Sequence, residues 1–158
     1  MIPTHDPYLR VFHINDSTDD QVLFQAACRM ANVPFNWHVA DSAEKGISYL
    51  QALLKLGKKT PVSWPDVILL DVVMPLTSGF EVLKFVRATP ELKHLPVVIF
   101  TSSLHPDCER QSMSLGANLF LMKPGVFPEV VELARNLYQL LRQWREKPAA
   151  DSTGCTND

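Results

Sequence analysis

Cysteine is scarce in this sequence of 158 residues, which contains only Cys28, Cys108 and Cys155. The three are far apart and odd in number, and no two have the short spacing found in structural zinc sites. We therefore expect reduced thiols, as in a cytoplasmic protein, and neither a disulfide framework nor a zinc site built from cysteines.

The sequence also has no long apolar run and no excess of one charge. No apolar stretch approaches the roughly 20 residues of a membrane-spanning helix, and no basic start followed by an apolar core indicates a signal peptide. Fifteen Lys and Arg against seventeen Asp and Glu leave a formal net charge of −2, which gives no broad basic surface. We expect one domain with no membrane and no direct nucleic-acid partner.

The most informative segment that is present is Val67-Ile68-Leu69-Leu70-Asp71, in which four apolar residues end in a single acid. A half-exposed strand would alternate apolar and polar residues, so this run predicts a central parallel strand buried on both faces. Open α/β sheets bind their ligands at the C-terminal ends of such strands. Asp71 is therefore a candidate nucleophile or metal ligand.

Strand and helix patterns alternate along the rest of the chain. The pattern predicts strands over residues 9–16, 35–40, 67–71, 97–101 and 117–122, and helices over 19–32, 43–57, 79–87, 105–115 and 127–145. This order predicts an α/β fold with a flavodoxin-like, doubly wound parallel sheet of five strands in the order 2-1-3-4-5, covered by five helices. We expect an N-terminal arm over residues 1–8, one domain over 9–146 and a disordered tail over 147–158.

Four polar residues stand at the C-terminal ends of the predicted strands: Asp16, Asp71, Thr101 and Lys123. The predicted topology brings them to one edge of the sheet. Two adjacent carboxylates repel each other unless a cation lies between them, and oxygen ligands on flexible loops suit Mg²⁺. A carboxylate beside Mg²⁺ can attack a phosphoryl donor and form an acyl phosphate, whose oxygens Lys123 and Thr101 would bind.

These residues carry a resemblance to a known family. Asp16, Asp71, Met74-Pro75, Gly79, Thr101 and Lys123-Pro124, in this order, resemble the receiver domain of two-component response regulators. The resemblance extends from about residue 9 to about residue 144. With no output domain in the sequence, the chain looks like a stand-alone receiver. Its long approach to the third strand and its last helix, which ends near a tryptophan, resemble the group that serves bacterial phytochromes.

The resemblance implies a role for each matching residue. Asp71 would be the phosphoacceptor, and Mg²⁺ would be held by Asp16, Asp71 and the backbone carbonyl of Val73. Thr101 would be the switch hydroxyl, and Phe120 holds the position of the aromatic switch. Lys123 would bind the acidic site, and the Lys123–Pro124 peptide would be cis.

The sequence departs from the family at Asn15, where a first of two adjacent acids is usual. The missing charge predicts weaker binding of Mg²⁺, although an amide at position 15 can still hold a metal-bound water. Val73 and Ser103 are expected to alter the lifetime of the acyl phosphate. Asp19 and Asp20 are interpreted as the acidic first turn of a helix, where negative charge is favourable.

The last helix has a wide apolar surface, with an arc of about 180° at 100° per residue. Packing on a sheet needs a narrower stripe, so Tyr138, Leu140 and Trp144 form a candidate interface, of which a homodimer is the simplest form. The alternative is a deeply buried helix with Trp144 folded over the edge of the core.

Together these features predict a phosphorylation-switched signalling module. A sensor histidine kinase or a phosphotransfer protein would donate to Asp71, the output would be protein binding, and catalysis would be limited to the module's own phosphorylation and dephosphorylation. A pseudo-receiver scaffold that is never phosphorylated is one alternative: Asn15 is compatible with it, but Asp71, Thr101 and Lys123 argue against it. An Asp-nucleophile phosphatase is another, but it would need a second acid where Val73 stands, and a flavodoxin would need a phosphate-binding loop after the first strand.

Overall fold

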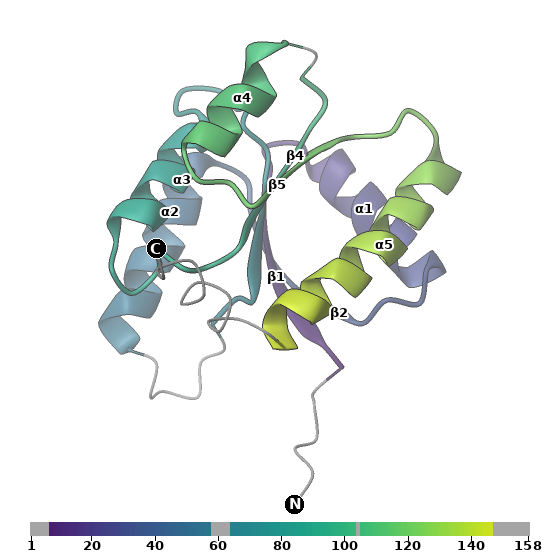
Figure 1. Ribbon diagram of the computed structural model, residues 1–158, viewed down its shortest axis with the longest axis horizontal. Helices are drawn as coiled ribbons and strands as arrows, with labels where there is room; N and C mark the ends of the chain where they lie inside the picture. The colour runs from purple at the N-terminus through teal and green to yellow at the C-terminus, as the bar shows by residue number, and fades with distance from the viewer. Residues whose placement is uncertain (1–6, 58–63, 104, 147–158) are drawn as a thin grey trace, which may run out of the picture.

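The computed structural model describes residues 7–57, 64–103 and 105–146, in which strands alternate with helices (Figure 1). The strands are β1 (Leu9–Ile14), β2 (Phe35–Ala40), β3 (Val67–Leu70), β4 (Val97–Thr101) and β5 (Leu119–Met122). The helices are α1 (Thr18–Met30), α2 (Ala43–Leu56), α3 (Gly79–Ala88), α4 (Asp107–Ser114) and α5 (Phe127–Glu146). The predicted elements are all found, and their ends lie close to the predicted positions.

The strands form one parallel sheet in the order β2-β1-β3-β4-β5, which confirms the predicted flavodoxin-like topology. Ile14 of β1 pairs with Leu70 of β3, which pairs with Ile99 of β4, so the three central strands end at nearly the same level. Thr101 pairs with Met122 of β5. The residues that follow these strand ends therefore lie side by side at the switch point of the sheet, where ligands bind in folds of this type.

Helices cover both faces of the sheet: α1 and α5 lie on one face, and α2, α3 and α4 lie on the other (Figure 1). The residues of β3 divide between the two cores. Ile68 and Leu70 pack with Leu50 of α2, while Leu69 packs with Ala134 of α5. This two-sided burial explains why the strand has no polar alternation.

Serine residues cap the N-termini of three of the helices. The hydroxyl oxygens of Ser17, Ser42 and Ser78 each accept a hydrogen bond of 3.1 Å from a backbone N–H in the first turn of the following helix. Ser17 follows the end of β1 by only three residues, so the first turn of α1 lies at the C-terminal edge of the sheet. Acidic residues in that turn are thereby placed next to the strand ends.

Helix α5 is buried more deeply than the sequence predicted. Tyr138 is only 8% exposed, packs against Phe35 and donates a hydrogen bond of 2.7 Å from its hydroxyl to the Pro7 carbonyl. Its polar tip is thus satisfied inside the molecule, and the prediction of Tyr138 as an interface residue is wrong. Trp144 packs partly buried against the same core, as in the alternative interpretation, and Leu140 is half-buried. The homodimer stays a prediction.

The described part of the predicted arm is held against α5, because Arg145 donates a hydrogen bond of 2.8 Å to the carbonyl of Tyr8. Residues 1–6, the predicted tail over 147–158, and Cys155 with it, lie outside the described residues. Cys28 and Cys108 are free and buried. Within the described ranges, no helix combines the length and the apolar character needed to cross a membrane.

Candidate functional site

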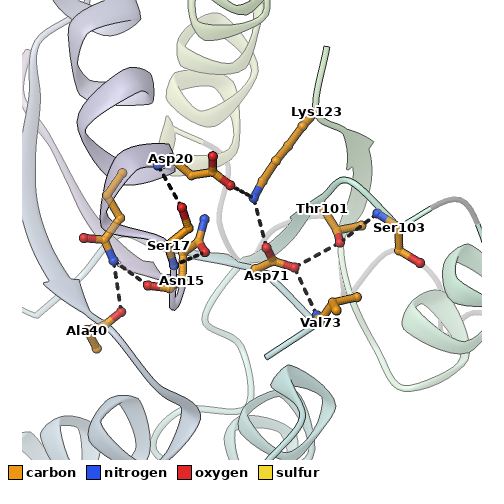
Figure 2. A network of polar contacts seen from close by, with 10 residues as sticks. Asn15, Ser17, Asp20, Ala40, Asp71, Val73, Thr101, Ser103 and Lys123 are labelled. Carbon is orange, nitrogen blue, oxygen red and sulfur yellow. Dashed lines mark hydrogen bonds and ion pairs between the residues drawn. The ribbon is translucent and has the colours of Figure 1, made fainter. Parts of the chain in front are cut away.

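Asp71 is the centre of the candidate site. It follows β3 directly, its backbone N–H donates to the Ile14 carbonyl at 3.0 Å, and the residue is 5% exposed. Its Oδ1 accepts hydrogen bonds from the Thr101 hydroxyl at 2.9 Å and from the Val73 backbone N–H at 3.0 Å (Figure 2). The carboxylate is therefore buried, and these two hydrogen bonds fix its orientation.

Lys123 binds the other oxygen of the same carboxylate. Its Nζ donates to Asp71 Oδ2 at 2.9 Å, and its backbone N–H donates to the Thr101 carbonyl at 2.8 Å, which fixes where the side chain leaves the sheet. Burial alone would lower the pKa of Lys123, but the hydrogen bonds and charges of Asp20 and Asp71 raise that pKa above its ordinary value. Lys123 is thus a cation at neutral pH, and Asp71, Thr101 and Lys123 meet as predicted.

The hydroxyl of Thr101 also faces the loop that follows β4. It accepts a hydrogen bond of 3.2 Å from the backbone N–H of Ser103 while it donates to Asp71. Thr101 is fully buried. A rearrangement at Asp71 that draws this hydroxyl away would therefore break its hydrogen bond with the Ser103 N–H.

A glycine is required behind Asp71. A Cβ on Gly79 would lie 2.1 Å from the Asp71 backbone oxygen and 2.8 Å from Val72 Cα. The loop closes through hydrogen bonds to the Val72 carbonyl from the Gly79 N–H at 3.1 Å and the Ser78 hydroxyl at 3.2 Å. This close approach explains the glycine that the sequence analysis singled out.

The predicted cis peptide between Lys123 and Pro124 is not found, since the peptide bonds of the described residues are all trans. The prediction is therefore wrong for this structure. The trans form is the intrinsically favoured one for a bond that precedes proline. Lys123 already reaches Asp71 with its backbone N–H bonded to β4, so the contact does not need a cis bond.

Asp20 joins the site, a contact that was not predicted from the sequence. Lys123 Nζ donates to Asp20 Oδ2 at 2.8 Å, as short as its bond to Asp71 (Figure 2). The interpretation of Asp20 as an acid in the first turn of a helix was correct, because its N–H is capped by Ser17. What could have indicated more is its position: this turn begins where β1 ends, at the same edge as Lys123.

The two residues after β1, Asn15 and Asp16, differ in their exposure and in the ligand atoms that they could present to a metal ion. Asn15 is fully buried, its Oδ1 accepts from the Ser17 N–H at 2.9 Å, and its Nδ2 has no partner among the described residues. Asp16 is exposed at the same edge. The described residues contain no group of three His, Cys, Asp or Glu side chains that could hold a metal. A site made of Asp16, Asp71 and the carbonyl of Val73 needs only two such side chains, and its oxygen donors suit Mg²⁺.

Phe120 is half-buried and packs against the core on the face covered by α2, α3 and α4. Its place on β5, next to Ile99 of β4, agrees with the predicted position. Its role as an aromatic switch stays a prediction.

The geometry defines a class of protein: an α/β sheet protein with a buried carboxylate at the switch point, held by a lysine on one oxygen and a hydroxyl on the other. The family model of the response regulator receiver domain matches residues 17–135. The chain therefore belongs to the response regulator receiver domain family of two-component signalling.

Relatives support this assignment. The chain is 32% identical over 128 residues to the two-component response regulator ORR1 of Oryza sativa subsp. indica, with 80% of this chain aligned but only 54% of ORR1, so it spans about half of that relative. It is 26% identical over 137 residues to the response regulator Rcp1 of Synechocystis, covering 87% of this chain and 91% of Rcp1.

Solved structures agree. The phosphorylated cyanobacterial phytochrome response regulator RcpA superimposes with a TM-score of 0.73 at 26% identity, over 85% of this chain and 94% of that one. The Mn²⁺-bound form of Rcp1 superimposes with a TM-score of 0.69 at 25% identity, over 82% and 91%.

Proposed function

We propose that Asp71 accepts a phosphoryl group from a phosphohistidine of a sensor histidine kinase or a phosphotransfer protein, and that the protein signals by phosphorylation-dependent binding. The observation that carries the proposal is that the two oxygens of the Asp71 carboxylate have different side-chain donors. Thr101 and Lys123, from two different strand ends, donate to different oxygens of one buried carboxylate. Such donors are suited to a group that gains negative charge at this position.

In the proposed reaction a carboxylate oxygen of Asp71 attacks phosphorus. A P–O bond forms while the P–N bond of the phosphohistidine breaks, and the electron pair stays on the imidazole, which leaves neutral when its other nitrogen carries a proton. A Mg²⁺ ion held by Asp16, Asp71 and the Val73 carbonyl would neutralise the charge on the transferring group. Lys123 then binds a phosphoryl oxygen, and hydrolysis of the acyl phosphate resets the protein.

The proposed output begins at Thr101. When its hydroxyl turns to a phosphoryl oxygen, the Ser103 N–H loses its acceptor, and the β4–α4 loop and Phe120 on β5 rearrange. The surface formed by this loop, α4 and β5 would thus have two states with different affinities for a partner. Catalysis by the protein is limited to its own phosphorylation and dephosphorylation.

The relatives support finer parts of the proposal. The similarity to RcpA, described as a cyanobacterial phytochrome response regulator, supports a phytochrome-type histidine kinase as the donor. The Mn²⁺-bound form of Rcp1 supports a divalent cation at the site. We place the protein in the cytoplasm, where such donors present their phosphohistidine.

The test is incubation with Mg²⁺ and acetyl phosphate followed by intact mass, with Asp71→Asn as the variant and Asp107→Asn on α4 as the matched control. We expect one labile phosphoryl adduct on the wild type and on Asp107→Asn, and none on Asp71→Asn. A folded wild type without an adduct would support the pseudo-receiver scaffold, the alternative with which Asn15 is compatible. Turnover of the donor that depends on Asp71 but leaves no adduct would support a phosphatase.

A further inference from the structure

The Lys123 ammonium is shared between two acids from distant parts of the chain. Its Nζ lies 2.8 Å from Asp20 Oδ2 and 2.9 Å from Asp71 Oδ2, and Figure 2 shows it between the two side chains. The Lys123 side chain is 13% exposed and that of Asp20 is 42% exposed. Asp20 thus lies at the mouth of the site, with Lys123 below it and Asp71 at the bottom.

The position of Asp20 is fixed by the start of α1. Its N–H donates to the Ser17 hydroxyl, and Ser17 in turn donates its own N–H to Asn15 Oδ1 at 2.9 Å. The chain from the end of β1 to the first turn of α1 is therefore tied together by side-chain hydrogen bonds. The carboxylate of Asp20 is held toward the strand ends instead of toward bulk solvent alone.

Asn15 explains why this acid matters. One lone pair of its Oδ1 is used by Ser17, and the buried Nδ2, without a partner among the described residues, is a donor, which cannot ligate a cation. Position 15 therefore adds no negative charge. With Asp20 included, three carboxylates against one ammonium leave the cluster of Asp16, Asp20, Asp71 and Lys123 with a net charge of −2, which matches a divalent cation.

We propose that Asp20 is the second acid of the phosphoryl site: a positioning residue that holds Lys123 and supplies, from the first turn of α1, the negative charge that Asn15 does not supply from the end of β1. Asp20 acts through Lys123 and through charge, not as a ligand of the ion. When Asp71 carries a phosphoryl group, Asp20 keeps Lys123 beside it while the ammonium exchanges Asp71 Oδ2 for a phosphoryl oxygen. This role rests on the function proposed above.

The test compares Asp20→Asn with Asp19→Asn. Both variants remove one carboxylate from the same helical turn, but Lys123 bonds only with Asp20 of these two residues, and Asp19 is exposed. Mg²⁺ is titrated by calorimetry at physiological salt, where the Debye length of about 8 Å screens distant charges. We expect Asp20→Asn to weaken Mg²⁺ binding about fivefold or more and Asp19→Asn to change it less than about twofold.

A double variant that moves the carboxylate from position 20 to position 15, called the relocation variant, provides a second test. Asn15→Asp combined with Asp20→Asn restores the net charge of the cluster, and an aspartate at position 15 can still accept the Ser17 N–H. We expect Mg²⁺ binding to return to within about twofold of the wild type. Circular dichroism checks that each variant is folded.

The pKa of Lys123, followed through its side-chain NMR signal, reports directly whether Asp20 binds the ammonium in solution. It should fall in Asp20→Asn and stay unchanged in Asp19→Asn, because only Asp20 bonds the ammonium. Equal effects of the two single variants on Mg²⁺ binding, no recovery in the relocation variant, or a wild type that does not bind Mg²⁺ would each overturn the role of Asp20.

The acetyl phosphate experiment on the same proteins separates this inference from the proposed function. If no protein, the wild type included, takes a phosphoryl group, the proposed function fails while the Mg²⁺ comparison still decides how Asp20 contributes charge. If the wild type is phosphorylated but Asp20→Asn and Asp19→Asn bind Mg²⁺ equally, the function stands and the inference fails.

Discussion

The Thr101 hydroxyl joins Asp71 to the backbone after β4. It donates a hydrogen bond of 2.9 Å to Asp71 Oδ1 and accepts one of 3.2 Å from the Ser103 N–H. One buried hydroxyl thus serves a charged acceptor on one side and a backbone donor on the other. A change in charge at Asp71 competes directly with the hydrogen bond to Ser103. The Thr101 hydroxyl therefore links the carboxylate to the backbone that follows β4.

Thr101→Val tests that link, because it keeps the β-branched shape of the buried side chain and replaces the hydroxyl with a methyl group. We expect phosphorylation of Asp71 to persist, but the phosphorylation-dependent change in amide hydrogen exchange over residues 101–103 and α4 to disappear. The Ser103 N–H loses its acceptor, so stability should fall by about 1 to 2 kcal/mol. Hydrogen exchange with and without acetyl phosphate measures the first effect, and urea unfolding measures the second.

Thr101→Ser is the control for this prediction, since it keeps the hydroxyl and deletes a methyl group. It should retain the exchange response of the loop. A full response in Thr101→Val would contradict the role of the hydroxyl.

Lys123→Met tests the charge balance of the site. Asp71 is buried and would lose its counter-ion, so we expect the metal-free protein to be destabilised by about 3 kcal/mol at pH 8. Mg²⁺ should recover part of this loss, because a bound cation replaces the missing positive charge and binds only the folded state. Urea unfolding with EDTA and with Mg²⁺ measures both effects.

Lys84→Met is the matched control, because Lys84 forms an exposed ion pair with Glu81 on α3. Such surface pairs contribute about 0 to 1 kcal/mol, so little change is expected. Equal losses in Lys84→Met and Lys123→Met would mean that Lys123 has no special part in holding Asp71.

The fold could be predicted almost completely because its three central strands, β1, β3 and β4, are buried along almost their whole length and the edge strands follow recognisable turn and cap residues. The trio of Asp71, Thr101 and Lys123 could be predicted for a topological reason: parallel strands deliver their C-terminal residues to one edge. The position of Asp20 just after β1 indicated the right edge of the sheet, but its contact with Lys123 spans 103 residues and depends on the direction of two side chains.

The error at Tyr138 has a similar cause. A helical arc shows how much of α5 is apolar, but not that the Pro7 carbonyl lies within reach of the phenol hydroxyl. Local patterns therefore locate the strands, helices and strand ends, while contacts between distant side chains need the folded structure.

Gly79→Ala tests the packing behind Asp71. A Cβ at this position would meet backbone atoms of Asp71 and Val72, which cannot move aside without shifting the loop. We expect a loss of about 3 kcal/mol in urea unfolding and a slower reaction with acetyl phosphate, because the carboxylate is displaced. Gly125→Ala is the control, since a Cβ there meets no atom within 4 Å. A Gly79→Ala protein as stable and reactive as Gly125→Ala would refute the requirement.

His13 provides a prediction about pH. This residue is 1% exposed and packs against the rings of Phe24 and Trp37, which also contact each other. Burial, aided by the charge of Lys123 and opposed by that of Asp20, lowers the pKa of His13 from 6.5 to about 3. The folded protein therefore holds His13 neutral at a pH where the unfolded chain binds a proton.

The sign follows from this difference in proton binding. Between the unfolded pKa of 6.5 and the folded value of about 3, the unfolded state carries the extra proton, so the contribution of His13 to stability is complete above pH 6.5 and is lost as the pH falls. Between pH 6.5 and pH 5 the free energy of unfolding loses about 2 kcal/mol through His13.

His13→Phe keeps an aromatic ring and removes the titrating group. Over the same pH range, the unfolding free energy of this variant should therefore fall by about 2 kcal/mol less than that of the wild type. Urea unfolding in EDTA at pH 7 and pH 5 measures the two slopes, with His94→Asn, a change at an exposed histidine, as the control. Parallel pH profiles for the wild type and His13→Phe would show that burial does not hold His13 neutral.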